Sequence, residues 1–268
     1  MKSRAIAGRR LRLLEVKWSG VRVLALVVAV LGGVGTLQGL AQLPRLFSLQ
    51  AVPSFAFTND QRLAGPEAIH ELQGSLPGNL GAFIALGVLL LAVLPLFVVV
   101  IRALITRAPV SASLGGLFLG GSVLAGFLLG ITALKVNELA IQSAAATPEE
   151  QTWLRGGITY LNQAHLIFVC GWFLFTGLGW IFLSLATARC DRWSRIFGRV
   201  GTAAGTLICL GVLARLWLPS YGKLAPQAFL FVASNTIELG LALGFLATGL
   251  LAWRLSSGAS TAPEPPPS

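Results

Sequence analysis

Charged residues are scarce in this chain. Of its 268 residues, 11% are charged and 55% are hydrophobic, and the mean hydropathy is +0.77. Soluble domains carry about 25% charged residues, so this chain has too little polar surface to cover a water-soluble globule. Cysteine is scarce as well. The three cysteines, Cys170, Cys190 and Cys209, show no CxxC spacing, and they predict reduced thiols rather than a disulfide framework.

The usual sequence patterns of catalytic and metal sites are also lacking. IHELQG begins like the zinc motif HExxH, but Gly74 occupies the position of the second histidine. LGGSVLAG departs from the nucleophile elbow GxSxG because Leu124 stands where a glycine is needed. The two histidines, His70 and His165, have no partner histidine four residues away. We therefore expect no catalytic residue, no metal site and no cofactor.

The hydrophobic residues are concentrated in long blocks. A bilayer-spanning helix needs about 20 mainly apolar residues, and each block must be helical because its backbone groups find no hydrogen-bond partners in hydrocarbon. The sequence thus predicts an all-α, polytopic membrane helix bundle with six transmembrane helices, forming one domain over residues 21–255. The six blocks are residues 21–40, 80–104, 114–136, 161–186, 200–218 and 228–253.

The net charge of +10 is distributed unevenly along the chain. If the N-terminus is inside, the inner segments hold 14 basic residues and three acids, and the outer segments hold six of each. Lys and Arg in short loops set the orientation of membrane proteins, so both termini are predicted to be cytoplasmic. This indicates a multi-pass protein of a bacterial inner (plasma) membrane. Nucleic acid is not an expected partner.

The two ends of the chain differ in composition. Residues 1–20 are basic, and they fit either a surface helix that binds anionic lipids or a charge cluster that only sets orientation. The apolar run that follows is longer than the core of a signal peptide, about 7–15 residues, so we expect an uncleaved anchor. Residues 256–268 are rich in proline and predict a disordered tail.

Two outer connections are long. Residues 41–79 contain four prolines and fit either a binding loop or a segment that lies on the outer membrane face. The connection after the third block contains TPEEQTWLRGG, in which Thr147 and Glu150 form a capping box. The glycines at 156 and 157 then predict that this helix ends, which gives an outer capped helix at about 147–155.

Five pairs of glycines, four positions apart, lie within four of the six blocks. In lipid, such spacing lets helices approach closely, so it favours a compact bundle, and it also suits a homo-oligomer or another membrane partner. The pairs are Gly35/Gly39, Gly116/Gly120, Gly126/Gly130, Gly201/Gly205 and Gly240/Gly244.

One carboxylate lies within the last block. Glu238 is 12 residues beyond Pro226, or roughly 18 Å at 1.5 Å per residue, and Asn235 lies one turn before it. Ionisable groups inside a membrane mark candidate functional sites, and the alternative explanation of Glu238 is a structural interhelical pair. Other polar residues are expected at a similar height in the outer leaflet: Arg215, His165, Gln163, Lys135 and Glu138.

The order of these segments resembles an uncharacterised family of bacterial six-helix membrane proteins. The resemblance covers roughly residues 20–255 and rests on AIQSAAATPEEQTWL, QAHLIFVCGWFLFTGLGW and DRWSRIFGRVGTAAG. The chain departs from the family in its longer basic N-terminus, and in Trp193-Ser194-Arg195, where the family more often has Phe-Pro-Arg. The resemblance implies the fold and the membrane location, and it carries no activity.

Three functional hypotheses follow. The first is small-solute or ion transport, or an accessory translocation subunit, that uses the outer-leaflet polar cluster. The second is a non-catalytic membrane scaffold or assembly protein that acts through its glycine-rich helix faces and basic N-terminus. The third, a membrane-embedded enzyme that modifies lipids, lacks the expected acid–base pairs and metal motifs.

Overall fold

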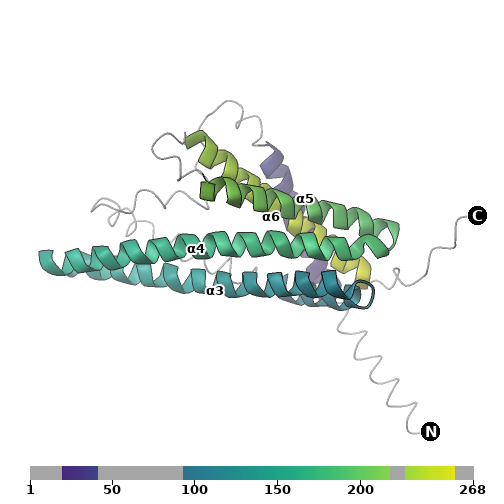
Figure 1. The fold of residues 1–268 in the computed structure, drawn as a ribbon, viewed down its shortest axis with the longest axis horizontal. Coiled ribbons are helices and arrows are strands. Elements are labelled where there is room, and N and C mark those ends of the chain that lie inside the picture. Colours follow the sequence, from purple (N-terminus) through teal and green to yellow (C-terminus); the bar gives the residue numbers. More distant parts are fainter. Residues whose placement is uncertain (1–19, 42–92, 218–226, 257–268) are drawn as a thin grey trace, which may run out of the picture.

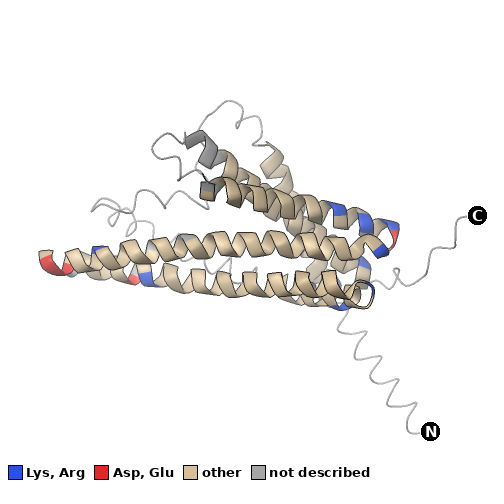
Figure 2. Ribbon diagram, in the orientation of Figure 1, with Lys and Arg blue, Asp and Glu red and all other residues tan. Residues whose placement is uncertain are grey.

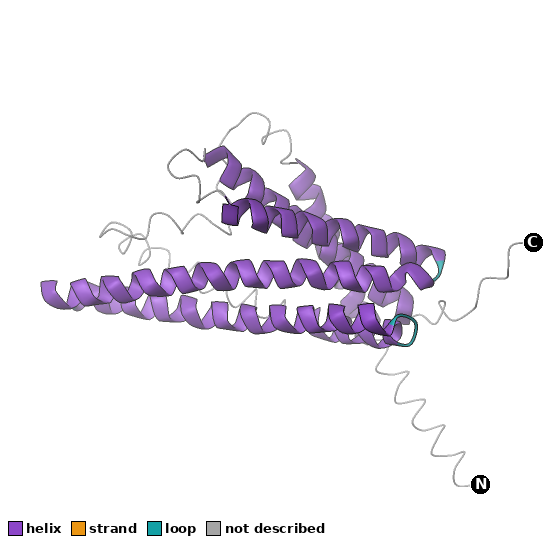
Figure 3. Cartoon of the chain, viewed as in Figure 1, coloured by secondary structure: helices purple, strands orange, loops and turns teal. Residues whose placement is uncertain are grey.

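The computed structural model describes residues 20–41, 93–217 and 227–256. Within these ranges the chain is almost entirely helical and contains no strand (Figure 3), which confirms the predicted all-α class. The basic N-terminal segment, the long outer loop and the proline-rich tail, which were predicted from the sequence, lie outside the described residues.

Six α-helices and one short 3-10 helix make up the described chain (Figure 1). Two helices precede the labelled ones, Gly20–Ala41 and Val93–Ile105. The others are α3 (Pro109–Ala145), α4 (Pro148–Ala186), η1 (Thr187–Arg189), α5 (Arg192–Trp217) and α6 (Gln227–Ser256).

Five of these helices contain segments that are long and apolar enough to cross a membrane. They are the helix Gly20–Ala41 and parts of α3, α4, α5 and α6. The sixth predicted span, residues 80–104, is represented by the shorter helix Val93–Ile105, and its first part lies outside the described residues. The structure therefore supports a multi-pass membrane protein.

The turn between α3 and α4 contains the predicted capping box. The Glu150 side chain accepts a hydrogen bond from the backbone N–H of Thr147 at 2.9 Å, and the Thr147 hydroxyl accepts one from the backbone N–H of Glu150 at 3.5 Å. Glu149 and Glu150 also place negative charge in the first turn of α4, where the helix dipole stabilises it. The capping-box prediction is confirmed.

The predicted end of the outer helix at the two glycines is wrong. α4 continues through Gly156 and Gly157 without a break as one helix of 39 residues. A glycine costs about 1 kcal/mol relative to alanine inside a helix, but packing against α3 offsets this cost. Gly157 lies next to Leu139, and Ile158 is buried against Val136.

α3 and α4 are too long for the hydrocarbon layer alone. Their 37 and 39 residues correspond to about 55 and 58 Å at 1.5 Å per residue, whereas the hydrocarbon core is about 30 Å thick. Even a helix tilted by about 40° would cover about 42 Å along the bilayer normal. The two helices therefore form a hairpin whose closed end, at Ala146 and Thr147, reaches beyond the hydrocarbon layer.

Glycines allow close contacts between the helices, as their spacing predicted. Gly205 of α5 lies against the Gly177 carbonyl of α4, and Gly240 of α6 lies against the Ala204 carbonyl of α5. The helix Gly20–Ala41 packs on α6, where Gly32 meets the backbone of Leu246. Two glycines of the predicted pairs, Gly120 and Gly130, lie on open surface, where an added Cβ atom would meet nothing within 4 Å.

Charged residues lie mainly at the two ends of the described bundle (Figure 2). Arginines gather at the end where α4 gives way to α5, and acidic residues lie at the closed end of the α3–α4 hairpin. We call these ends the arginine end and the hairpin end. The long apolar stretches between them have almost no charge, as a bilayer requires.

Candidate functional site

Glu238 lies in the first half of α6, within a candidate membrane span. Ser234 is four residues before it and Phe245 is seven residues after it, so the three side chains share one face of the helix. Phe245 makes an edge-on contact with Trp180 of α4, with ring centroids 5.7 Å apart. Glu238 thus shares a face of α6 with Phe245, one of the residues that contact Trp180 of α4.

The neighbouring faces of α6 are occupied by other helices. On one side, Ile237 packs against Gly211 of α5. On the other side, Leu239 packs against Gly39 of the helix Gly20–Ala41. Because consecutive residues are about 100° apart around a helix, Glu238 lies between these two contacts, and its side chain is half-buried.

The Glu238 carboxyl has one oxygen that accepts no hydrogen bond from the described residues. Its Oε1 atom is buried and accepts no hydrogen bond within the described part of the chain. A buried polar atom normally has a partner, because leaving one without a hydrogen bond costs about 1–3 kcal/mol. Oε1 is therefore an acceptor that a proton, a cation or a solute donor could satisfy.

The predicted partner His165 lies on α4 and is half-buried. Its Nδ1 atom is 3.4 Å from the Thr132 hydroxyl of α3. That hydroxyl also donates to the Leu129 carbonyl at 2.9 Å, and a hydroxyl has only one proton. In this arrangement the Nδ1 of His165 is the donor to Thr132. Gln163, two residues earlier on α4, is exposed.

Lys135 and Glu138 form an ion pair on α3. The Lys135 Nζ atom is 2.5 Å from Glu138 Oε2, and the side chains are 59% and 50% exposed. The pair joins adjacent turns of one helix, and exposed pairs of this kind contribute about 0–1 kcal/mol. It is therefore a surface feature of the α3–α4 hairpin.

The remaining predicted residues are on α5 and α6. Asn235 and Ser234 are buried, with 9% and 2% of their surfaces exposed. Arg215 belongs to α5, but its side chain lies outside the described residues. Of the predicted cluster, the structure pairs Lys135 with Glu138 and places His165 beside Thr132. The convergence of the cluster on Glu238 stays a prediction.

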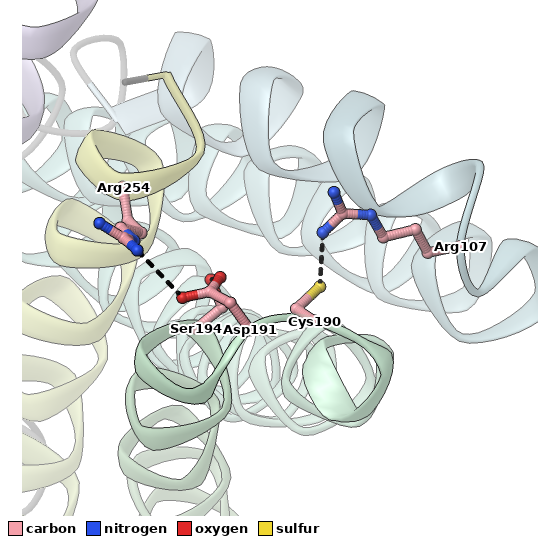
Figure 4. A network of polar contacts seen from close by, with 5 residues as sticks. All are labelled: Arg107, Cys190, Asp191, Ser194 and Arg254. Carbon is pink, nitrogen blue, oxygen red and sulfur yellow. Dashed lines mark hydrogen bonds and ion pairs between the residues drawn. The ribbon is translucent and has the colours of Figure 1, made fainter. Parts of the chain in front are cut away.

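The structure also contains a polar network at the arginine end, which the sequence did not indicate (Figure 4). Arg254 of α6 is 3.4 Å from the Asp191 carboxylate, and Arg107 donates to the Cys190 sulfur at 3.2 Å. Ser194 donates to Asp191 at 2.6 Å. We call these five residues the inner clasp, because they connect α6, the α4–α5 turn and the residues just before α3.

Two further contacts extend the inner clasp. Arg189 donates to the Arg107 carbonyl at 3.3 Å, and Arg22 donates to the Ser256 carbonyl at 2.7 Å. The latter links the helix Gly20–Ala41 to the end of α6. In the sequence, Asp191 could have drawn attention as the one acid in the basic stretch ARCDRWSRIFGR, but nothing there shows that Arg254 is its partner.

Asp191 is stabilised in its charged form. Burial acts to raise its pKa, but the hydrogen bond from Ser194, the positive charge of Arg254, and the backbone N–H groups of Ser194 and Trp193 outweigh that effect and lower the pKa. The carboxylate therefore stays negative at neutral pH and holds Arg254.

The bundle has little empty space near the inner clasp. A cavity of about 20 Å³ lies among four helices, with Val100, Trp180, Ser184, Phe197 and Thr248 among its lining residues. This is enough for about one water molecule and too small for a solute. Trp180 helps to close the cavity by donating to the Thr248 hydroxyl at 3.0 Å.

Comparisons with protein-family models, with curated proteins and with solved structures find no match. The resemblance to bacterial six-helix proteins therefore stays a prediction. Within the described ranges there is no group of three or more His, Cys, Asp or Glu side chains that could hold a metal ion. The candidate site is thus built from Glu238, with the inner clasp at the opposite level of the bundle.

Proposed function

We propose that this protein transports a small solute or an ion, or serves as an accessory subunit of such a transporter. The observation that carries the proposal is the buried Oε1 atom of Glu238, which has no hydrogen-bond partner in the described part of the chain. A carboxyl group in a membrane span is costly to maintain. Binding and release of a proton, cation or solute at this atom would give the Glu238 carboxyl a role in transport.

The packing of α4 on α5 supports the same proposal. Their contacts extend from the pair Thr187 and Gly198, near the arginine end, to the pair Gly177 and Cys209. The inner clasp closes the arginine end. Beyond these contacts the α3–α4 and α5–α6 pairs diverge (Figure 1). Glu238 belongs to the level at which the pairs separate, because its neighbour Ile237 packs on Gly211, just beyond Cys209. A site at this level would be reached from the hairpin side.

We also propose the membrane arrangement on which transport would depend. The chain crosses a bacterial inner membrane six times, and both termini lie on the cytoplasmic side with the arginine end. The excess of arginine at that end supports this orientation. The helix Val93–Ile105 would be the inner part of the second span.

Glu238→Gln tests the transport proposal. The wild-type protein and the variant are reconstituted into vesicles, and flux is measured over a panel of alkali cations, protons and small polar solutes. We expect the wild-type protein to transport at least one of these ions or solutes. In the variant that flux should fall at least tenfold, while its abundance in the membrane is unchanged. Glu149→Gln removes an equivalent charge from the exposed first turn of α4, and it should retain wild-type flux.

Two outcomes would contradict this assignment. Flux that is no higher in wild-type vesicles than in empty ones would argue against transport by the protein alone. A Glu238→Gln variant that disappears from the membrane, while Glu149→Gln accumulates normally, would show that Glu238 has a structural role.

A scaffold function is the second candidate, and the hairpin supports it. Trp153 is 84% exposed beside Gly156, where an added Cβ atom would meet nothing within 4 Å. Together with Thr152 and Gly157 they line an open hollow on α4, which a partner could fill. Co-purification of one membrane partner at fixed stoichiometry, lost in Trp153→Ala but kept in Glu238→Gln, would favour this function.

A further inference from the structure

Three arginines lie along the first turns of α5. Arg192, Arg195 and Arg199 are three and four residues apart, so they lie on one side of the helix. All three are exposed, and the first and last are about 10 Å apart along the helix axis. We call this set the arginine stripe.

Positive charge exceeds negative charge around the arginine stripe. Residues 187–199 contain four arginines and a single acid, Asp191, and that acid is engaged by Arg254 and Ser194. A side of the protein with this excess of positive charge attracts anions from outside the chain.

The arginine stripe is on the side of α5 that faces away from the rest of the bundle. Leu210 lies about five turns beyond Arg192 and about three turns beyond Arg199, so all three share a face. Leu210 is 56% exposed, whereas Ala204 and Ile208 on the opposite face are fully buried. In a membrane this exposed apolar face is covered by acyl chains.

The residues between the arginines fit the boundary of the bilayer. Trp193 is 56% exposed and Ile196 is 37% exposed, and the apolar span of α5 begins at this point. Exposed tryptophan side chains favour the headgroup layer, and arginine side chains extend from the edge of the hydrocarbon toward phosphate groups. The arginine stripe is therefore at headgroup height, directly next to a face covered by acyl chains.

We propose that the arginine stripe and the adjoining apolar face form a binding site for an anionic phospholipid of the inner leaflet. Arginine binds phosphate oxygens through two parallel N–H groups, and three arginines over about 10 Å can hold the phosphate and the anionic headgroup. The acyl chains then lie along the exposed face toward Leu210. This site is separate from Glu238, and it does not depend on the transport proposal.

The test uses the purified full-length protein in a neutral detergent. Its melting temperature is followed while phosphatidylglycerol is added, and parallel titrations use phosphatidylcholine with the same acyl chains and inorganic phosphate. We expect phosphatidylglycerol alone to raise the melting temperature. Replacing Arg192, Arg195 and Arg199 together by Gln should weaken this response about a hundredfold in lipid concentration, since each basic residue contributes about fivefold near an anionic surface.

Matched variants separate lipid binding from a general effect of charge. Arg102→Gln removes an exposed charge from the same end of the bundle, and it should change the response less than twofold. Replacing the three arginines by Lys keeps the charge and the expected orientation but removes the paired N–H groups, and it should weaken the response several-fold. A triple Gln variant that responds like the wild type would overturn the proposal.

A second measurement uses only the wild-type protein, in case the triple Gln variant does not fold. A photoreactive phosphatidylglycerol is cross-linked to the protein in vesicles, and the modified peptides are identified by mass spectrometry. We expect cross-links on the first half of α5, and competition by unlabelled phosphatidylglycerol but not by phosphatidylcholine. Cross-links confined to other helices or to residues 1–19 would overturn the proposal.

Discussion

Single residues decide how closely the helices can approach. At Gly244 of α6, an added Cβ atom would overlap with the Trp180 ring. The ring cannot move away easily, because its N–H group donates to Thr248 and it makes an edge-to-face contact with Phe245. A side chain at position 244 would therefore separate α6 from α4, and that separation would also affect the helix turns around Glu238.

Gly244→Ala is expected to destabilise the bundle by about 1–3 kcal/mol, the usual cost of overpacking. Gly130→Ala is the matched control, because nothing lies within 4 Å of its Cβ position and alanine favours the helix by about 1 kcal/mol. Thermal unfolding in detergent measures both variants. Equal melting temperatures for the two would show that the contact between Trp180 and Gly244 does not form.

At the scale of the elements, the helix ends are held together by polar contacts and the helix middles by small residues. The inner clasp connects α6 to the α4–α5 turn through Asp191 and Arg254. Because these two residues are 63 positions apart, the contact restrains the tertiary arrangement and does not stabilise a single helix. Its strength depends on the ionisation of Asp191.

The stability of the bundle should fall at acidic pH through Asp191. Its pKa is lower in the folded protein than in the unfolded chain, so the carboxylate contributes stability above the unfolded value of about 3.9. This contribution is lost as the pH falls from about 4 through the lower folded pKa. Melting temperatures measured between about pH 7 and pH 3 should fall less steeply for Asp191→Asn than for the wild type. Parallel curves would mean that other groups account for the acid sensitivity.

The α3–α4 hairpin shows where local sequence signals are insufficient. The capping box could be predicted because Thr147 and Glu150 are three residues apart, and their contacts lie within one turn. The continuation of α4 through Gly156 and Gly157 could not be predicted in the same way. It depends on Leu139 and Val136 of another helix, and a local glycine signal carries no information about that partner.

At the scale of the whole molecule, the ends of the bundle differ in charge. The arginine end and the acidic hairpin end are separated by the apolar lengths of the helices (Figure 2). If the arginine end is cytoplasmic, the closed end of the hairpin must be on the outer side. This orientation predicts that residues at the two ends of the bundle are accessible from opposite sides of the membrane.

Cysteine labelling should place the two ends on opposite sides of the membrane. In a background without the native cysteines, Glu149→Cys should react with an impermeant maleimide added to intact cells. Ala188→Cys, at an exposed position of the arginine end, should react only after the membrane is opened. Tags on both termini should likewise become accessible only after the membrane is opened. Termini on opposite sides would contradict an even number of spans.

The candidate site could be predicted only in part. Glu238 was recognisable because a carboxylate inside an apolar block is conspicuous in any sequence. The unsatisfied state of its Oε1 atom among the described residues and its place between the contacts of two other helices depend on helix packing. His165 was expected near Glu238 because both lie in the outer half of the bundle. Residues at a similar depth in the membrane can contact different neighbours, and His165 contacts Thr132.

The sequence by itself determined the helical class, the apolar segments and the uneven distribution of charge. These properties depend on composition and on contacts within a few residues, because backbone groups in hydrocarbon must bond within their own helix. The tertiary structure alone decided that Arg254 holds Asp191, that Trp180 packs on Gly244, and that α4 continues past its two glycines. Each of these contacts joins residues of different helices, and the order of residues along one helix does not specify its neighbour.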